Sequence, residues 1–175
     1  MLIALLRTPV TLITLIACAV IYFMQTQNER ITSQYRYQYF QIKQGQYYRF
    51  LTGGFLHANT WHLLMNLYSL YNLGTVMERY LGSIPFAVIL IGSVIVGNLF
   101  CYMMNVHAAV GLSGGLYGIM LVYICVILKH SSASLITILR YNLANILINF
   151  LPGVAWQAHL GGAVFGILAA ILLRV

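Results

Sequence analysis

Acidic side chains are almost absent from this chain of 175 residues. It has two acidic residues, Glu29 and Glu78, and no aspartate. A Ser-His-Asp triad needs one aspartate and an aspartyl protease needs two, so both mechanisms are excluded. The His-Glu-x-x-His motif of zinc proteases does not occur either. Any hydrolytic chemistry must therefore rely on Ser, His and neutral groups.

Cysteine is scarce too, and its spacing indicates no binding function. The three cysteines lie inside apolar runs and form no Cys-x-x-Cys pair: Cys18, Cys101 and Cys125. They are interpreted as small buried hydrophobic residues, with neither a disulfide framework nor a metal site implied. We expect no metal and no cofactor.

Charged residues of either sign are also few. Charged residues make up 6% of the chain and hydrophobic residues 61%, with a mean hydropathy of +0.86. Soluble domains contain about 25% charged residues, so this composition indicates an integral membrane protein. The net charge of +7 suits contact with anionic membrane lipids, and nucleic-acid binding is not expected.

At about 20 residues per helical span, the chain is long enough for six spans in one all-α bundle. Residues 1–175 are therefore predicted to form a single domain. The predicted spans cover approximately 2–24, 60–80, 84–104, 113–128, 138–151 and 157–173. The first is interpreted as a retained span, because no small-residue cleavage site follows Met24. Residues 25–49 mix tyrosines with cations and are predicted to form an interfacial loop.

The distribution of positive residues between the loops hardly determines the membrane orientation. With a cytoplasmic N-terminus, the loops would carry five positive residues inside and four outside. We favour this orientation because it places the polar residues of the spans near the outer face. The absence of a transit peptide favours a prokaryotic plasma membrane. For span 2, His57 is considered as a cap, and Glu78-Arg79 is expected to close the span near an aqueous surface.

One hydroxyl stands among small residues directly before an apolar run. Ser113 is surrounded by Gly111, Gly114, Gly115 and Gly118, which let backbone or ligand approach closely. We expect Ser113 in the first turn of a buried helix, where unpaired N–H groups and the helix dipole favour a developing anion. The alternative is that Ser113 merely caps the helix and the glycines only serve packing.

Spans 2, 4 and 6 would run in the same direction, and each carries polar residues near its start. His62 and Asn66 are four residues apart on one face of span 2, Ser113 begins span 4, and His159 lies in the first turn of span 6. These four residues are therefore predicted to lie in one layer below one membrane surface. Unpaired polar groups are costly in lipid, so they should face the bundle interior or a water-filled cavity.

These residue types fit nucleophilic catalysis. A neutral His can take the proton of an attacking Ser near pH 7, and the resulting oxyanion needs preorganised donors. His62, the Asn66 amide and the Ser113 N–H are suitable donors. Each residue alone has a simpler interpretation: His159 as an interfacial residue, Asn66 as a bridge between helices, and Tyr117 as core packing.

Three short motifs match those of a known family. They are Gly111-Leu112-Ser113-Gly114, similar to Gly-x-Ser-Gly; His62-Leu63-Leu64-Met65-Asn66, similar to His-x-x-x-Asn; and Ala158-His159-Leu160-Gly161-Gly162-Ala163-Val164-Phe165-Gly166, similar to Ala-His-x-x-Gly-x-x-x-Gly. With Arg49 and Glu78 as further matches, the chain resembles the rhomboid intramembrane serine proteases. Tyr48 stands where that family usually has Trp, which leaves the anchoring of the first loop open.

The resemblance implies a role for each matching residue. Ser113 would be the nucleophile and His159 its general base, and His62, Asn66 and the Ser113 N–H would form the oxyanion hole. Tyr117 would orient His159. Gly162, with Gly166 four residues on, would let span 6 approach span 4. Residues 150–156 would be a mobile cap and span 5 a lateral gate. The implied substrates are transmembrane proteins, cut in or beside their membrane helix.

Two further classes are considered. A non-catalytic rhomboid-like protein would bind membrane helices without cutting them, and loss of the Ser or the His would mark it. A small transporter or channel would line a pore with the same polar layer, but those residues gather at one end of their spans and no internal repeat is evident.

Overall fold

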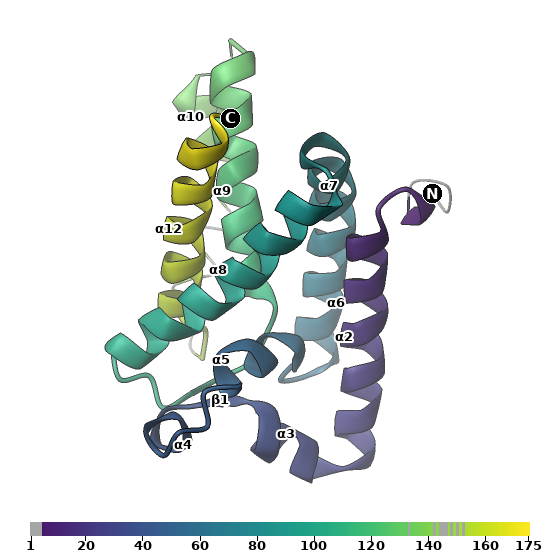
Figure 1. Cartoon of the computed structure of the whole chain (residues 1–175), viewed down its shortest axis with the longest axis vertical. Coiled ribbons are helices and arrows are strands. Elements are labelled where there is room, and N and C mark those ends of the chain that lie inside the picture. The colour runs from purple at the N-terminus through teal and green to yellow at the C-terminus, as the bar shows by residue number, and fades with distance from the viewer. Residues whose placement is uncertain are drawn as a thin grey trace.

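The computed structural model describes residues 5–132, 134–141, 143, 147, 149, 151 and 153–175. The elements are α2 (Pro9–Gln27), α3 (Glu29–Tyr35), β1 (Tyr37–Gln38), α4 (Tyr39–Lys43), α5 (Arg49–Thr52), the 3-10 helix η1 (Gly53–Phe55), α6 (Thr60–Ser69), the π-helix η2 (Leu70–Gly74), α7 (Thr75–Leu81), α8 (Ser83–Met103), β2 (Ala108–Ala109), α9 (Ser113–His130), α10 (Leu135–Tyr141) and α12 (Trp156–Leu173). The predicted helical membrane bundle is confirmed (Figure 1).

Within the part of the chain that the structure describes, four helices are long and apolar enough to cross a membrane: α2, α8, α9 and α12. The first begins at Pro9 and ends at Gln27, later than the predicted 2–24, and proline suits the first turn of a helix because its missing N–H has no intrahelical partner there. The third, fourth and sixth predicted spans agree with α8, α9 and α12 within about two residues. The count of six spans stays a prediction.

The second predicted span is one continuous path of three helical segments, α6, η2 and α7. Its π-helical turn ends at Gly74, where a side chain would meet the Thr11 hydroxyl of α2 at 2.9 Å. The fifth predicted span, 138–151, begins within α10. Beyond Tyr141 most of it lies outside the described residues.

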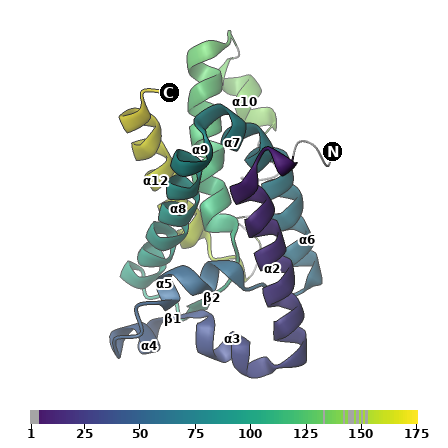
Figure 2. The same cartoon turned by 45° about the vertical axis from the view of Figure 1, so that its right-hand side comes forward.

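Glycines set how closely the last helices pack. Gly162 and Gly166 of α12 face the carbonyl groups of Gly114 and Gly118 on α9, where a side chain would not fit. Small residues allow such close contact in lipid, where helices gain little from burying apolar surface. Helices α9 and α12 lie side by side in both views, and the start of α6 lies at the same end of the bundle as theirs (Figures 1 and 2).

The apolar core joins α2, η2, α7, α8, α9 and α12. Its fully buried members include Cys18, Leu70, Met77, Phe86 and Ile119. Cys18 and Cys101 are buried, Cys125 is half-buried, and all three thiols are free. Cys18 and Cys101 are thus buried as predicted, whereas Cys125 is only partly so.

The predicted interfacial loop, 25–49, is largely helical. Helices α3 and α4 lie across one end of the bundle (Figure 2), and β1 between them pairs antiparallel with β2, Tyr37 opposite Ala109. Arg49, 4% exposed, ties this region together: its guanidinium donates to the carbonyls of Ser33 and Arg36 and to the Gln46 side chain at 2.8–3.0 Å. Each of these bonds is charge-assisted, and such bonds are stronger than neutral ones.

Of the pair Glu78-Arg79, which was expected to close span 2 near water, Arg79 is exposed but Glu78 is not. Glu78 is 2% exposed, and its carboxylate accepts hydrogen bonds from the backbone N–H groups of Val10 and Thr11 and from the Ser83 hydroxyl at 2.7–2.9 Å. These two N–H groups belong to the first turn of α2, so a negative group there also meets the positive end of the helix dipole. Glu78 therefore joins span 2 to the start of span 1.

The suggestion that His57 caps span 2 is also wrong. Asn59 is the N-cap of α6, and its side chain accepts a hydrogen bond from the His62 backbone N–H at 2.8 Å. Asparagine is among the best N-cap residues for this reason. His57 lies two residues earlier, where Gln25 of α2 pairs with its backbone N–H and carbonyl.

Candidate active site

Helix α9 begins at Ser113, as the sequence predicted, but the serine does not cap it. The N-cap residue is Leu112, whose side chain makes no capping hydrogen bond. Gly111, at φ +123°, makes the turn before it. The Gly111 N–H donates to the Gly53 carbonyl at 3.0 Å, which fixes the entry of the chain into α9. The alternative of a helix-capping serine is therefore excluded.

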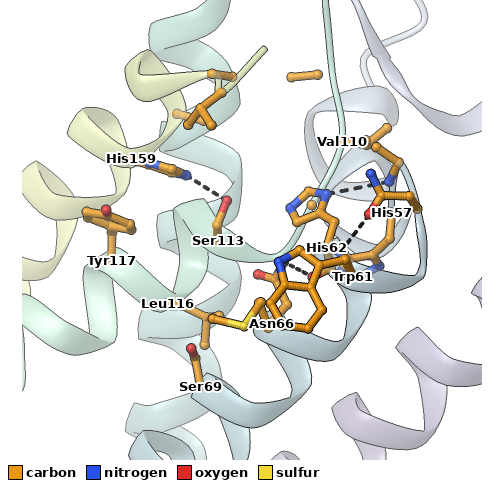
Figure 3. Close-up of a pocket in the computed structure, with 18 of the residues that line it drawn as sticks. His57, Trp61, His62, Asn66, Ser69, Val110, Ser113, Leu116, Tyr117 and His159 are labelled. Carbon is orange, nitrogen blue, oxygen red and sulfur yellow. Dashed lines mark hydrogen bonds between the residues drawn. The ribbon is translucent and has the colours of Figure 1, made fainter. Parts of the chain in front are cut away.

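The Ser113 hydroxyl instead meets the ring of His159. Ser113 Oγ lies 2.7 Å from His159 Nε2, and His159 is 6% exposed in the first turns of α12. Figure 3 shows this contact across the gap between the two helices. The close packing of α12 against α9 through Gly162 brings the two side chains within hydrogen-bond reach.

Tyr117 covers one face of the His159 ring. The two rings are stacked, with centroids 4.2 Å apart and planes inclined by 6° (Figure 3). Tyr117 lies one turn after Ser113 on α9, so one helix supplies both the hydroxyl and the ring that supports its partner. Tyr117 thus contacts the ring that the family resemblance implied it would orient.

Asn149 is a residue near the site to which the sequence analysis assigned no role. Its Oδ1 lies 2.6 Å from His159 Nδ1, and its Nδ2 donates to the Tyr117 hydroxyl at 2.9 Å. The available signal was the presence of asparagines in an apolar predicted span, which indicates shielding from lipid. That signal does not reveal which side chain an asparagine pairs with.

His62 and Asn66 come from α6, on the opposite side of Ser113 from His159 (Figure 3). His62 Nδ1 faces the Ala58 N–H at 3.5 Å, which leaves Nε2 to carry the ring proton. That nitrogen points at Gly111, where a side chain would lie 2.7 Å from it. Asn66 is 4% exposed, and its Nδ2 donates one hydrogen to the His62 carbonyl at 2.8 Å, so the second stays available.

The serine, the two histidines, Tyr117 and Asn66 open onto one cavity of about 1010 Å³ between α6, α9 and the start of α12. It is lined by His62, Asn66, Ser113, Tyr117 and His159, among others. Pockets for drug-sized ligands are typically about 300–1,000 Å³, so this one has room for several residues of an extended peptide. Predicted residues from three helices thus come together.

The lining of the cavity is mostly apolar, with polar side chains set among the apolar ones, and it is nearly uncharged. Among the described residues that line it, Arg36 is the only Lys, Arg, Asp or Glu. His57, 2% exposed, has its ring centroid 5.2 Å from that of His62. Burial, with a smaller effect of His62, lowers the pKa of His57 to about 4, so this side chain is neutral near pH 7.

Arg49 and Glu78 do not line the cavity. Both are buried elsewhere: Arg49 holds the loop after α2. Glu78 holds the start of α2. Gly162 and Gly166 lie at the contact between α9 and α12. Of the expected cap, 150–156, Phe150 and Pro152 lie outside the described residues, as does most of the expected gate. In the described part of the chain, no three His, Cys, Asp or Glu side chains group as a metal site would need.

Fold and site together define a polytopic helical membrane protein with a Ser-His pair in a cavity between its helices. A family model described as the rhomboid domain matches residues 44–175. The chain therefore belongs to the rhomboid family, as its three motifs indicated.

Curated relatives carry names of the same kind. The chain is 31% identical over 140 residues to the putative rhomboid protease YdcA of Bacillus subtilis, which covers 75% of this chain and 69% of the relative. It is 31% identical over 137 residues to the rhomboid protease GluP of B. subtilis, covering 75% of this chain and 27% of the relative. Rhomboid-like protease 1 of Toxoplasma gondii is 32% identical over 137 residues, with coverage of 71% and 46%. The chain thus matches less than half the length of the last two.

Proposed function

We propose that this chain is an intramembrane serine endopeptidase that cuts transmembrane proteins in or beside their membrane helix. The observation that carries the proposal is the 2.7 Å contact between Ser113 Oγ and His159 Nε2 inside the cavity. A hydroxyl attacks a peptide carbonyl only when a base removes its proton, and an imidazole nitrogen at this distance can do so.

In the proposed reaction, His159 Nε2 takes the Ser113 proton while Oγ bonds to the scissile carbonyl carbon. The C=O electrons move to the oxygen, which becomes the oxyanion of a tetrahedral intermediate. The C–N bond then breaks, and the imidazolium gives its proton to the leaving amine. Water repeats these steps on the acyl-enzyme, with His159 again as the base, and releases the acid product.

The oxyanion needs donors that are in place before charge develops. The Ser113 N–H lies at the start of α9, where no intrahelical carbonyl accepts from it and where the helix dipole adds positive potential. The Asn66 amide and His62 Nε2 come from the facing helix. The proposed oxyanion hole therefore joins two helices, with Gly111 between them.

The substrate class follows from the position of the site in a membrane bundle. A transmembrane helix hides its carbonyls in hydrogen bonds, so the scissile segment must unwind as it enters the cavity, which favours residues that weaken a helix. We place the protein in a prokaryotic plasma membrane as one domain, with the cavity near the outer face.

The test is cleavage of a single-span model substrate by the purified protein in lipid vesicles. Ser113→Ala and His159→Ala should each abolish the product while the thermal unfolding profile stays close to that of the wild type. Asn66→Ala should retain partial activity, because loss of one oxyanion donor typically costs about 100- to 1,000-fold. Cleavage at the wild-type rate by Ser113→Ala would instead support a binding protein contaminated by another protease.

A further inference from the structure

We propose that Asn149 is a positioning residue that completes a Ser113–His159–Asn149 triad in this protein. The inference rests on the proposed function, and it concerns a residue that neither the three motifs nor the comparisons assign. It comes from a predicted span different from those that carry Ser113, His159 and the oxyanion donors. Three features support this role: the tautomer that His159 needs, the orientation of the Asn149 amide, and the absence of an acidic acceptor.

The first feature is the tautomer of His159. For His159 to take a proton from Ser113, Nε2 must be unprotonated, so Nδ1 must carry the ring hydrogen. A hydrogen at Nδ1 needs an acceptor, and Asn149 Oδ1 lies 2.6 Å away. In the other tautomer Nε2 would donate to Ser113, and the pair would have no base. The carbonyl of Asn149 therefore selects the productive form.

The second feature is the orientation of the Asn149 amide. An amide has a donor end and an acceptor end, and turning it over would present its NH₂ group to His159 Nδ1. The Tyr117 hydroxyl accepts from Asn149 Nδ2 at 2.9 Å, which holds the donor end away from the histidine. Tyr117 also stacks on the imidazole at 4.2 Å. The three side chains thus fix one another in both position and polarity.

The third feature is the chemistry of the acceptor. In triads with aspartate the acceptor is a carboxylate, but this sequence contains no aspartate. A charged group inside a membrane bundle carries a large desolvation cost, whereas a neutral amide accepts the same hydrogen bond at a smaller cost. An uncharged acceptor suits a cavity in which, among the described residues, Arg36 supplies the only Lys, Arg, Asp or Glu side chain.

The test compares Asn149→Ala, Asn149→Asp and a control outside the site and the expected gate, Val88→Ala on α8, whose side chain is 59% exposed. Substrate cleavage is measured in vesicles as a function of pH, with kcat and KM determined separately. Asn149→Ala should lower kcat by about 10- to 100-fold, the range seen when the partner that orients a metal-bound histidine is removed, while KM changes little. Val88→Ala should stay within about twofold of the wild type for both.

Asn149→Asp separates a positioning role from a merely structural one, because only a positioning role predicts a change in its pH profile. Its carboxylate still accepts from Nδ1, so kcat should recover relative to Asn149→Ala. Because the carboxylate also stabilises the imidazolium, the acid limb of the pH profile should move to higher pH. Asn149→Ala with unchanged kcat, or Asn149→Asp with no recovery and an unmoved limb, would overturn the proposal.

A second measurement does not depend on protease activity. Nitrogen-15 NMR of ring-labelled histidine, with His159 assigned from the His159→Ala spectrum, reports the protonated nitrogen directly. Wild type should show Nδ1–H, and Asn149→Ala should show a mixture of tautomers. Identical His159 spectra in both would refute the positioning role. If the tautomer shifts but no variant, the wild type included, cleaves substrate, then the proposed function fails while the role of Asn149 stands.

Discussion

Replacing Gly111 by alanine tests whether the oxyanion site depends on the contact between the chain before α9 and His62. Gly111 has φ +123°, and an added Cβ would lie 2.6 Å from His62 Cε1 and 2.7 Å from Nε2. Ordinary contact begins near 3.4 Å, so the ring must move by about 0.8 Å. A displacement of about 1 Å can cost about 100-fold in rate, and loss of an oxyanion donor costs a similar factor.

The same substitution also strains the backbone, and a matched control separates the two effects. Gly45 has φ +91° with nothing within 4 Å of its added Cβ. Gly45→Ala should therefore lose about 1–2 kcal/mol of stability from the positive φ, measured by thermal unfolding, and keep its cleavage rate. Gly111→Ala should lose stability as well and in addition lose about 100-fold in kcat.

The assay is cleavage of the single-span substrate in vesicles, with His62→Ala and the double variant included. If the clash acts through His62, adding Gly111→Ala to His62→Ala should cost little further activity, because the donor is already gone. Equal cleavage rates for Gly111→Ala and Gly45→Ala would refute the reasoning, and so would full additivity with His62→Ala.

Three further predictions follow from the packing. Gly162→Ala should reduce cleavage more than it reduces stability, because its Cβ would collide with the Gly114 carbonyl and push His159 away from Ser113; unchanged activity would contradict this. Glu78→Gln should lower the free energy of unfolding by about 1–3 kcal/mol, since a buried charge-assisted cap is lost. The folded variant should still react at Ser113 with a fluorophosphonate probe, and an unchanged unfolding temperature would contradict the prediction. His57 binds its proton more weakly in the folded chain, with a pKa of about 4 against 6.5. Its contribution to stability should thus be complete above pH 6.5 and decline as pH falls towards 4, by up to about 3 kcal/mol; an equal decline in His57→Gln would refute it.

The motifs predicted where the helices of the site begin better than they predicted the contacts between distant segments of the chain. Ser113 and His159 could be placed at helix starts because glycines and apolar runs surround them, and local sequence governs helix starts. Their meeting followed from the parallel direction of alternate spans. The tight contact of α9 and α12 was indicated by Gly162 and Gly166, since small residues four apart form one face.

What the sequence did not predict depends on contacts between distant segments. Glu78 accepts hydrogen bonds from backbone N–H groups that lie 67 and 68 positions earlier, and no local pattern tells a buried carboxylate from one that faces water. Strands β1 and β2 are two residues each, too short for an alternating pattern. Asn149 could be identified as shielded, but its pairing with His159 depends on how the helices are arranged.

The central claim is that Ser113 is activated by His159 inside the membrane bundle. The most direct test is labelling of the detergent-purified protein with a fluorophosphonate, which bonds only to an activated serine. We predict labelling of the wild type at Ser113, identified by mass spectrometry, and none in folded Ser113→Ala or His159→Ala. Labelling that persists in His159→Ala, or that maps to another residue, would contradict the account.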